Sequence, residues 1–92
     1  MILIRLEYKN NVEQFEKVLE EVEEVKDELQ RKEIDKSKLL SECWDVIQAV
    51  FGIMFLNFSI KEIFKGYKTH LLKLQGRHND KKIKIDEYVE VS

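Results

Sequence analysis

The chain has 92 residues with 18 acidic and 16 basic side chains, which gives a net charge of −2. This length allows one domain at most, residues 1–92, and the charge balance excludes a general nucleic-acid-binding protein, which would carry a basic face. A single cysteine, Cys43, excludes a disulfide framework and is typical of a reducing compartment, so we expect a cytoplasmic protein without a signal peptide.

The first predicted elements are a short strand and an acidic helix. Residues 1–8 alternate in polarity, with one side formed by Ile2, Ile4, Leu6 and Tyr8. Asn10 or Asn11 can cap a helix that ends at about Arg31. The apolar positions of this helix recur at three- and four-residue spacing and are Phe15, Val18, Leu19, Val22, Val25 and Leu29.

A second helix is predicted from about Lys38 to Asn57, after a polar connection in which Asp35 or Ser37 is the cap. Its apolar run from Val46 to Ile60 is shorter than the roughly 18–20 residues that span a membrane, so we interpret it as buried. The helix is apolar almost all round, and one partner helix cannot cover it. We therefore expect a homodimer, or a dimer of dimers, in which this helix meets its copy.

A third helix is predicted to begin with a capping box formed by Ser59 and Glu62 and to end near Gln75, with Gly76 as its C′ residue. A second strand is predicted over residues 82–91, and it could pair with the first strand within a chain or between chains. The expected fold is thus an all-α bundle of about three helices per chain, completed by dimerisation, with short terminal β-strands.

Two acids interrupt the apolar second helix. Glu42 and Asp45 are the only acidic residues between Ser37 and Lys61, and their spacing of three places both on one helical face. Carboxylates in such surroundings are costly unless a cation pairs with them. The alternative is a solvent-exposed helix start, where the positive end of the helix dipole favours acids.

The first helix supplies possible co-ligands in an EExxE pattern, Glu20, Glu21 and Glu24. If the two helices pack antiparallel, the two carboxylate pairs can face each other and form an oxygen-rich site suited to Mg²⁺ or Mn²⁺. The alternative is an ordinary solvated face, because this helix is so acidic that a second ExxD match, from Glu24 to Asp27, also occurs in it.

The third helix carries basic residues that suit an anion. Lys73 and Arg77 are one turn apart and can reach the same phosphate, although an ordinary basic helix end is an equal alternative. On the second helix, the small residues Ala49 and Gly52 extend the face of Asp45 and leave room for a ligand or for a closely packed helix.

Three segments together resemble a known family: EEVEE from Glu20, ECWDVIQA from Glu42, and KLQGR from Lys73. They are similar to the all-α NTP pyrophosphohydrolases, which comprise the MazG-like enzymes and the dimeric dUTP and dCTP pyrophosphatases. The resemblance covers about residues 15–77 and rests on the order and spacing of the motifs. It implies hydrolysis of an NTP or dNTP to the monophosphate and pyrophosphate.

The resemblance also implies roles for individual residues. Mg²⁺ would be held by Glu21, Glu24, Glu42 and Asp45. Glu20 would orient a ligand or water, and Lys73 and Arg77 would contact the triphosphate. The family usually has a further helix before the EExxE helix, where this chain has a predicted strand. The alternatives are therefore a non-catalytic member that binds a nucleotide or a protein, or an unrelated helical dimerisation module.

Overall fold

The computed structural model describes residues 2–91, which form three helices. Helix α1 spans Asn11–Leu29, α2 spans Lys36–Asn57 and α3 spans Ile60–Asn79. The all-helical character expected from the sequence is confirmed. The chain divides into two compact units, Ile4–Asn57 and a second unit that contains residues 2–3 and 58–91.

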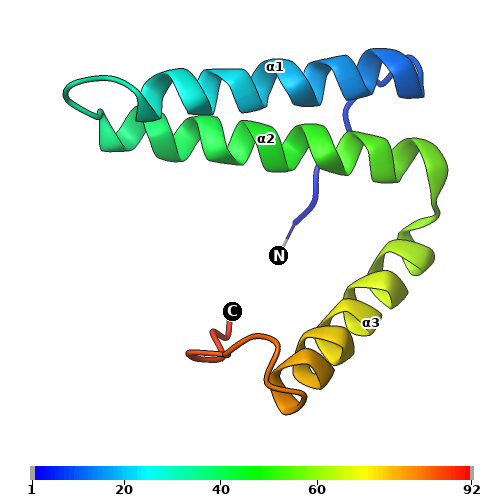
Figure 1. The fold of residues 1–92 in the computed structure, drawn as a ribbon. Coiled ribbons are helices and arrows are strands. Elements are labelled where there is room, and N and C mark those ends of the chain that lie inside the picture. Colours follow the sequence, from blue (N-terminus) through cyan, green and yellow to red (C-terminus); the bar gives the residue numbers. More distant parts are fainter. Residues whose placement is uncertain (1, 92) are drawn as a thin grey trace. The chain divides into compact units, whose positions relative to one another are not determined.

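In the first unit, α1 and α2 form an antiparallel hairpin (Figure 1). Asn11 exchanges side-chain hydrogen bonds with Asn57 at one end, Gln14 Nε2 donates to the carbonyl of Ala49 at 2.8 Å, and Glu28 lies near Lys38 at the other end. These contacts pair the start of α1 with the end of α2. The antiparallel packing that the carboxylate hypothesis requires is therefore present.

The caps of the three helices agree closely with the sequence. Asn10 Oδ1 accepts from the backbone N–H of Glu13 at 2.8 Å, and Asp35 Oδ1 accepts from that of Lys38 at 3.1 Å. At α3, Ser59 and Glu62 form both hydrogen bonds of the predicted capping box. Each cap satisfies backbone donors that a helix start leaves unpaired.

The end of α3 differs from the prediction. Gly76 lies inside the helix, which continues to Asn79, and the left-handed residue is Lys81 with φ 62°. Lys82 N–H donates to the carbonyl of Arg77 and Lys81 N–H to that of His78, which together form a Schellman motif. The prediction of a helix end at Gly76 was wrong because a helical glycine costs only about 1 kcal/mol, and here these later hydrogen bonds end the helix.

The predicted strands, residues 1–8 and 82–91, are not seen as strands in residues 2–91, and Met1 lies outside the described residues. The first segment packs on α2 instead, because Gln48 Nε2 donates to the carbonyl of Ile4 at 2.7 Å and to Tyr8 Oη at 3.1 Å. The Tyr8 ring stacks on that of Phe55, and the Arg5 guanidinium lies 4.8 Å from the centre of the same ring. Pairing of the two segments between chains stays a prediction.

The hydrophobic core is very small. Ala49 and Phe55 are the only buried apolar side chains among the described residues of this structure. On α1, the buried residues are polar and spaced by seven, Gln14, Glu21 and Glu28, and the half-buried Val18 and Val25 lie between them. The apolar stripe of α1 is largely exposed, with Phe15 at 54% and Leu19 at 53%. Many large apolar side chains of the described residues are therefore exposed to solvent.

Helix α2 begins two residues before the predicted Lys38 and ends at the predicted Asn57. Its 22 residues are long and apolar enough to cross a membrane by length and composition alone, a test that core helices of soluble proteins also meet. Within the unit Ile4–Asn57, Leu40, Trp44 and Ile47 of this helix are exposed. The expectation that α2 is buried against its copy in a dimer stays a prediction.

Candidate functional site

Glu21 is the most deeply placed carboxylate of the EExxE pattern. Its residue is only 7% exposed, because it lies on the face of α1 that packs against α2. Oε1 forms an ion pair of 2.8 Å with Lys17 Nζ, and this hydrogen-bonded contact raises the pKa of Lys17. Oε2 is buried and has no hydrogen-bond partner in the described structure. One oxygen of this carboxylate therefore lacks both a hydrogen-bond donor and solvent, which is energetically costly.

Glu24, one turn further along α1, experiences the charges of its neighbours. Its pKa is raised, first by the charge of the neighbouring Glu21 carboxylate, then by desolvation, and finally by the charges of Glu20 and Glu42. Four carboxylates from two helices thus act on one another, although Glu24 itself is exposed. Such mutual repulsion favours either a shared proton or a bound cation.

Glu42 on α2 faces the same carboxylates of α1. It is half-buried, and its Oε2 atom is buried without a hydrogen-bond partner. Together with Glu24 it lines a cavity of about 420 Å³, whose other walls are formed by Asp27, Glu28, Arg31 and Lys38. The expectation that this acid of the apolar helix is poorly solvated agrees with the structure.

Asp45 is placed differently. It is exposed, and it lines a second cavity of about 330 Å³ together with Glu21, Lys17 and residues of the N-terminal segment. The argument from burial therefore applies to Glu42 but not to Asp45. The structure brings Glu20, Glu21 and Glu42 within electrostatic reach of Glu24, whereas Asp45 shares a cavity with Glu21.

These carboxylates do not form a ready metal site. Within residues 2–91, no group of three Asp, Glu, His or Cys side chains is arranged so that it could hold a metal ion. One reason is visible at Glu21, where Lys17 engages Oε1. The chemistry of the donors still fits Mg²⁺, because all are carboxylate oxygens and two of the oxygens are buried without a partner. Metal binding stays a prediction.

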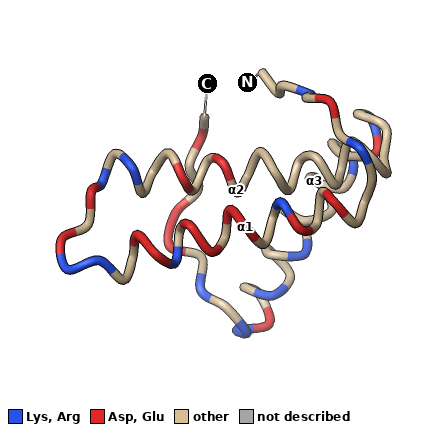
Figure 2. The backbone as a smooth tube through the Cα atoms, turned by 90° about the horizontal axis from the view of Figure 1, so that it is seen from above, with Lys and Arg blue, Asp and Glu red and all other residues tan. Residues whose placement is uncertain are grey.

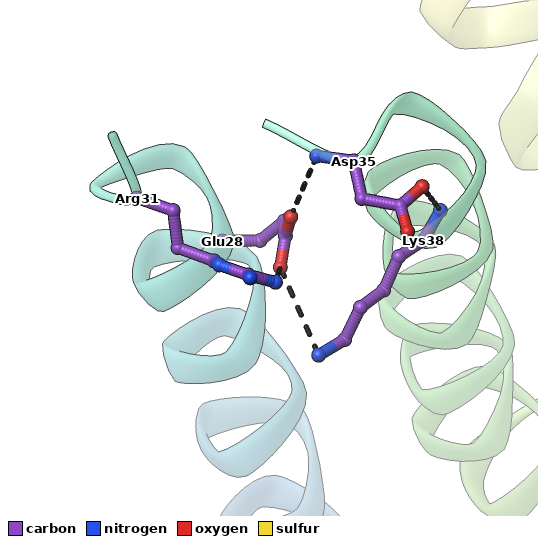
Figure 3. Close-up of polar contacts among 4 residues, drawn as sticks. All are labelled: Glu28, Arg31, Asp35 and Lys38. Carbon is purple, nitrogen blue, oxygen red and sulfur yellow. Dashed lines mark hydrogen bonds and ion pairs between the residues drawn. The ribbon is translucent and has the colours of Figure 1, made fainter. Parts of the chain in front are cut away.

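Glu28 is a residue that the sequence reading missed. It is 2% exposed, and its Oε1 accepts from the backbone N–H of Asp35 at 2.9 Å (Figure 3). Its Oε2 lies 3.3 Å from Arg31 Nη1 and 3.8 Å from Lys38 Nζ. The hydrogen bond from Asp35, followed by Arg31 and Lys38, lowers the pKa of Glu28 although burial alone would raise it. The spacing of seven from Glu21 was the signal that could have revealed it.

The small residues of α2 serve close packing. A Cβ atom added to Gly52 would lie 2.7 Å from Gln14 Cδ and 2.7 Å from Tyr8 Cε1. Glycine therefore allows both α1 and the N-terminal segment to approach α2. Of the two interpretations left open for Ala49 and Gly52, packing agrees with the structure.

The two basic residues expected to contact phosphate, Lys73 and Arg77, are exposed on α3 in the second compact unit. In that unit the C-terminal segment returns to α3, because Ile85 N–H donates to His78 Nδ1 at 3.1 Å and Tyr88 Oη donates to Gln75 Oε1. Lys81, Lys82 and Lys84 line a basic cavity there with His78. The participation of Lys73 and Arg77 in one site with the carboxylates stays a prediction.

Comparison with known proteins adds no assignment. No family model, no curated protein and no solved structure matches the chain. The function must therefore be inferred from the side chains themselves, above all from the carboxylates shared by α1 and α2.

Proposed function

We propose that this chain is a Mg²⁺-dependent nucleoside triphosphate pyrophosphohydrolase of the MazG-like kind, which cleaves an NTP or dNTP to the monophosphate and pyrophosphate. The observation that carries the proposal is the pair of buried carboxylate oxygens without partners, Oε2 of Glu21 and Oε2 of Glu42. Unpartnered buried carboxylate oxygens are costly, and a divalent cation would offset that cost.

The cation would be held by carboxylates of both helices, namely Glu21, Glu24, Glu42 and Asp45. Mg²⁺, or Mn²⁺ in its place, prefers such oxygen donors, and the mutual repulsion recorded in the raised pKa of Glu24 is what a cation would relieve. When bound, the ion would supply neutralisation of phosphate charge and a water of lowered pKa.

The remaining roles belong to side chains around this group. Glu20, which is exposed beside Glu21 on α1, would orient the attacking water by accepting its hydrogen bond. Lys73 and Arg77 would bind the phosphate oxygens and stabilise the charge that develops on the leaving pyrophosphate. The substrate is thus a nucleotide with at least three phosphates, held through its charge rather than through a deep apolar pocket.

The active form would be a homodimer or a dimer of dimers in the cytoplasm, without stable binding to nucleic acid or membrane. The support is the apolar surface of α2, on which Leu40 is 61% and Trp44 is 58% exposed. Association through α2 would bury these side chains, and the terminal segments could then pair as strands between subunits.

The test is an assay of pyrophosphate release from a panel of NTPs and dNTPs, with Mg²⁺ or with a chelator. We expect release that requires Mg²⁺ and that falls at least about 100-fold in Glu42→Gln, because a ligand to the ion is lost. Glu33→Gln is the matched control, since Glu33 is an exposed acidic residue in the connection between α1 and α2. Release that persists in chelator, or that survives Glu42→Gln, would overturn the proposal.

The second candidate is a non-catalytic helical dimer that binds a nucleotide or a protein partner. It is favoured by one observation: among residues 2–91 no three side chains are ready to hold a metal ion, while large apolar side chains are exposed on all three helices. Dimer formation without Mg²⁺-dependent turnover, unaffected by Glu42→Gln, would support this candidate.

A further inference from the structure

Helix α1 presents an apolar stripe to solvent that is interrupted at one position. Its positions alternate in spacing between three and four residues, and the apolar members are Val12, Phe15, Leu19, Val22 and Leu29, exposed by between 46% and 69%. The missing position is Lys26, whose side chain is paired with Glu23 at 3.7 Å. This is the a/d pattern of a helix that packs lengthwise against another helix, and it is distinct from the face with the buried Gln14, Glu21 and Glu28 that packs on α2.

Helix α3 carries a second stripe with the same periodicity. Ile60, Phe64, Tyr67 and Leu71 are 44–59% exposed, and Leu74, which follows in the same series, is half-buried. No residue of α3 is buried in the described structure. Helix α3 therefore has an apolar face of the right length for α1 and lacks a core of its own.

The two helices have opposite charge. Helix α1 has eight acidic and two basic residues, a net charge of −6, and Figure 2 shows acidic positions recurring along it. Helix α3 has five basic residues and one acidic residue, a net charge of +4. Two copies of α1, or two copies of α3, would repel each other along their length, whereas α1 and α3 attract.

The charges that flank the stripes are matched in spacing as well as in sign. Glu16 and Glu23 flank the α1 stripe, Lys61 and Lys68 flank the α3 stripe, and each pair is separated by seven residues. In heptad notation all four occupy e positions, and e positions face each other when two helices run antiparallel. In that orientation Glu16 meets Lys68 and Glu23 meets Lys61.

The same antiparallel register aligns the apolar positions. It sets Val12 against Leu74 and Phe15 against Leu71 at one end of the pair. It then sets Leu19 against Tyr67 and Val22 against Phe64, and only Lys26 opposes an apolar residue, Ile60. One register thus satisfies both the apolar layers and the flanking charges, which a chance alignment of two helices would not be expected to do.

We propose that α3 of a second copy of this chain docks antiparallel on the exposed stripe of α1, and that the contact is made reciprocally in a two-fold dimer. The antiparallel orientation indicates that this α3 belongs to a second copy and not to the same chain. Only Phe58 and Ser59 connect α2 to α3, so folding α3 back onto its own hairpin would set it antiparallel to α2 and hence parallel to α1. A parallel pair would not bring these e positions together.

The area agrees with a stable dimer. Nine half-exposed side chains per chain, each on the order of 150–200 Å² in full, would bury roughly 800 Å² on each partner, the size of a standard protein interface. The inference is independent of the hydrolase proposal, because Glu16, Glu23, Lys61 and Lys68 are outside the carboxylate site. Loss of nucleotide hydrolysis would leave it standing.

The first test is an exchange of charges followed by mixing. Variant A carries Glu16→Lys and Glu23→Lys, and variant B carries Lys61→Glu and Lys68→Glu. In a dimer of either variant alone, the exchanged positions of α1 and α3 carry charges of the same sign and repel each other. Sedimentation at low salt should therefore show association at least about 10-fold weaker than that of the unchanged chain. An equimolar mixture of A and B should associate again, because each α1 then meets an α3 of opposite charge.

The mixing experiment distinguishes docking of α3 from a second copy from docking of α3 within its own chain. If α3 docked within its own chain, mixing A with B would restore nothing, whereas one chain with all four substitutions would behave normally; that pair of results would overturn the proposal. An unchanged chain that sediments as a monomer at all concentrations would overturn it as well.

The second test determines the register. In a Cys43→Ser background, chains with Glu16→Cys are mixed with chains with Lys68→Cys and oxidised mildly. We expect a disulfide between positions 16 and 68 of different chains, identified by mass spectrometry. The control pair, Glu16→Cys with Lys61→Cys, is displaced by seven residues, about 10 Å along the helix, and should cross-link far less. Equal cross-linking of both pairs would contradict the antiparallel register.

Discussion

Glu28 accepts a 2.9 Å hydrogen bond from the backbone N–H of Asp35, so a buried carboxylate at the end of α1 joins the residue that caps α2 (Figure 3). Arg31 and Lys38 lie on either side of it and compensate its charge. At this end of the hairpin that carries the candidate site, α1 and α2 are therefore joined by a buried hydrogen bond and by ion pairs. The strength of this connection should depend on the ionisation of a single side chain.

The first prediction concerns that ionisation. The pKa of Glu28 is lowered in the folded chain, so its contribution to stability is present above its ordinary value of 4.5 and is lost as the pH falls through the lowered folded value. We expect Glu28→Gln to lower the melting temperature by several degrees at pH 7 and by much less at pH 3. Thermal unfolding at the two pH values measures this, and an equal loss at both would contradict the stabilising role of the Glu28 charge.

The second prediction concerns Glu24. At pH 7 in chelator, Glu24→Gln should raise the melting temperature, because it removes a charge that Glu21, Glu20 and Glu42 repel. In the unchanged chain, added Mg²⁺ should raise the melting temperature by binding the folded state, and this response should be lost in the variant. Thermal unfolding with and without Mg²⁺ provides the measurement. A variant that keeps the full Mg²⁺ response would exclude Glu24 as a ligand.

The third prediction compares two glycines. Gly52→Ala should destabilise the chain by about 1–3 kcal/mol, because the added Cβ would overlap Gln14 and Tyr8. Gly66→Ala is the matched control in α3, where an added Cβ meets nothing within 4 Å, and it should stabilise the helix by about 0.5–1 kcal/mol. Chemical denaturation distinguishes the two, and effects of the same sign would contradict the packing described for Gly52.

The fourth prediction concerns the end of α3. Lys81 has a left-handed backbone conformation. This conformation raises the free energy of a residue that has a side chain, whereas glycine adopts it at almost no cost. Lys81→Gly should therefore stabilise the second unit by about 0.5–1 kcal/mol. Lys84→Gly serves as a control for the loss of a nearby positive charge. Hydrogen exchange of the last turn of α3 would report the effect, and faster exchange in Lys81→Gly would contradict it.

The candidate site was only partly predictable. Glu42 could be recognised from the sequence because a carboxylate stands out in an apolar helix, and its buried oxygen agrees with that reading. Asp45 belongs to the same motif but is exposed, and it lies one turn further along α2, where it lines a different cavity together with residues of the N-terminal segment. The spacing of residues along a helix predicts which of them share a face, but the burial of each residue depends on the segment that packs against it.

The sequence by itself determined where the helices begin, because the caps at Asn10, Asp35 and Ser59 are hydrogen bonds that span three residues and need no distant partner. It also determined that the first helix has apolar residues at three- and four-residue spacing. Only the tertiary structure decided that α1 turns Gln14, Glu21 and Glu28 toward α2 and leaves Phe15, Leu19, Val22 and Leu29 exposed to solvent. Periodicity records the composition of each helical face, whereas the choice of the face to bury depends on contacts between residues far apart in the chain.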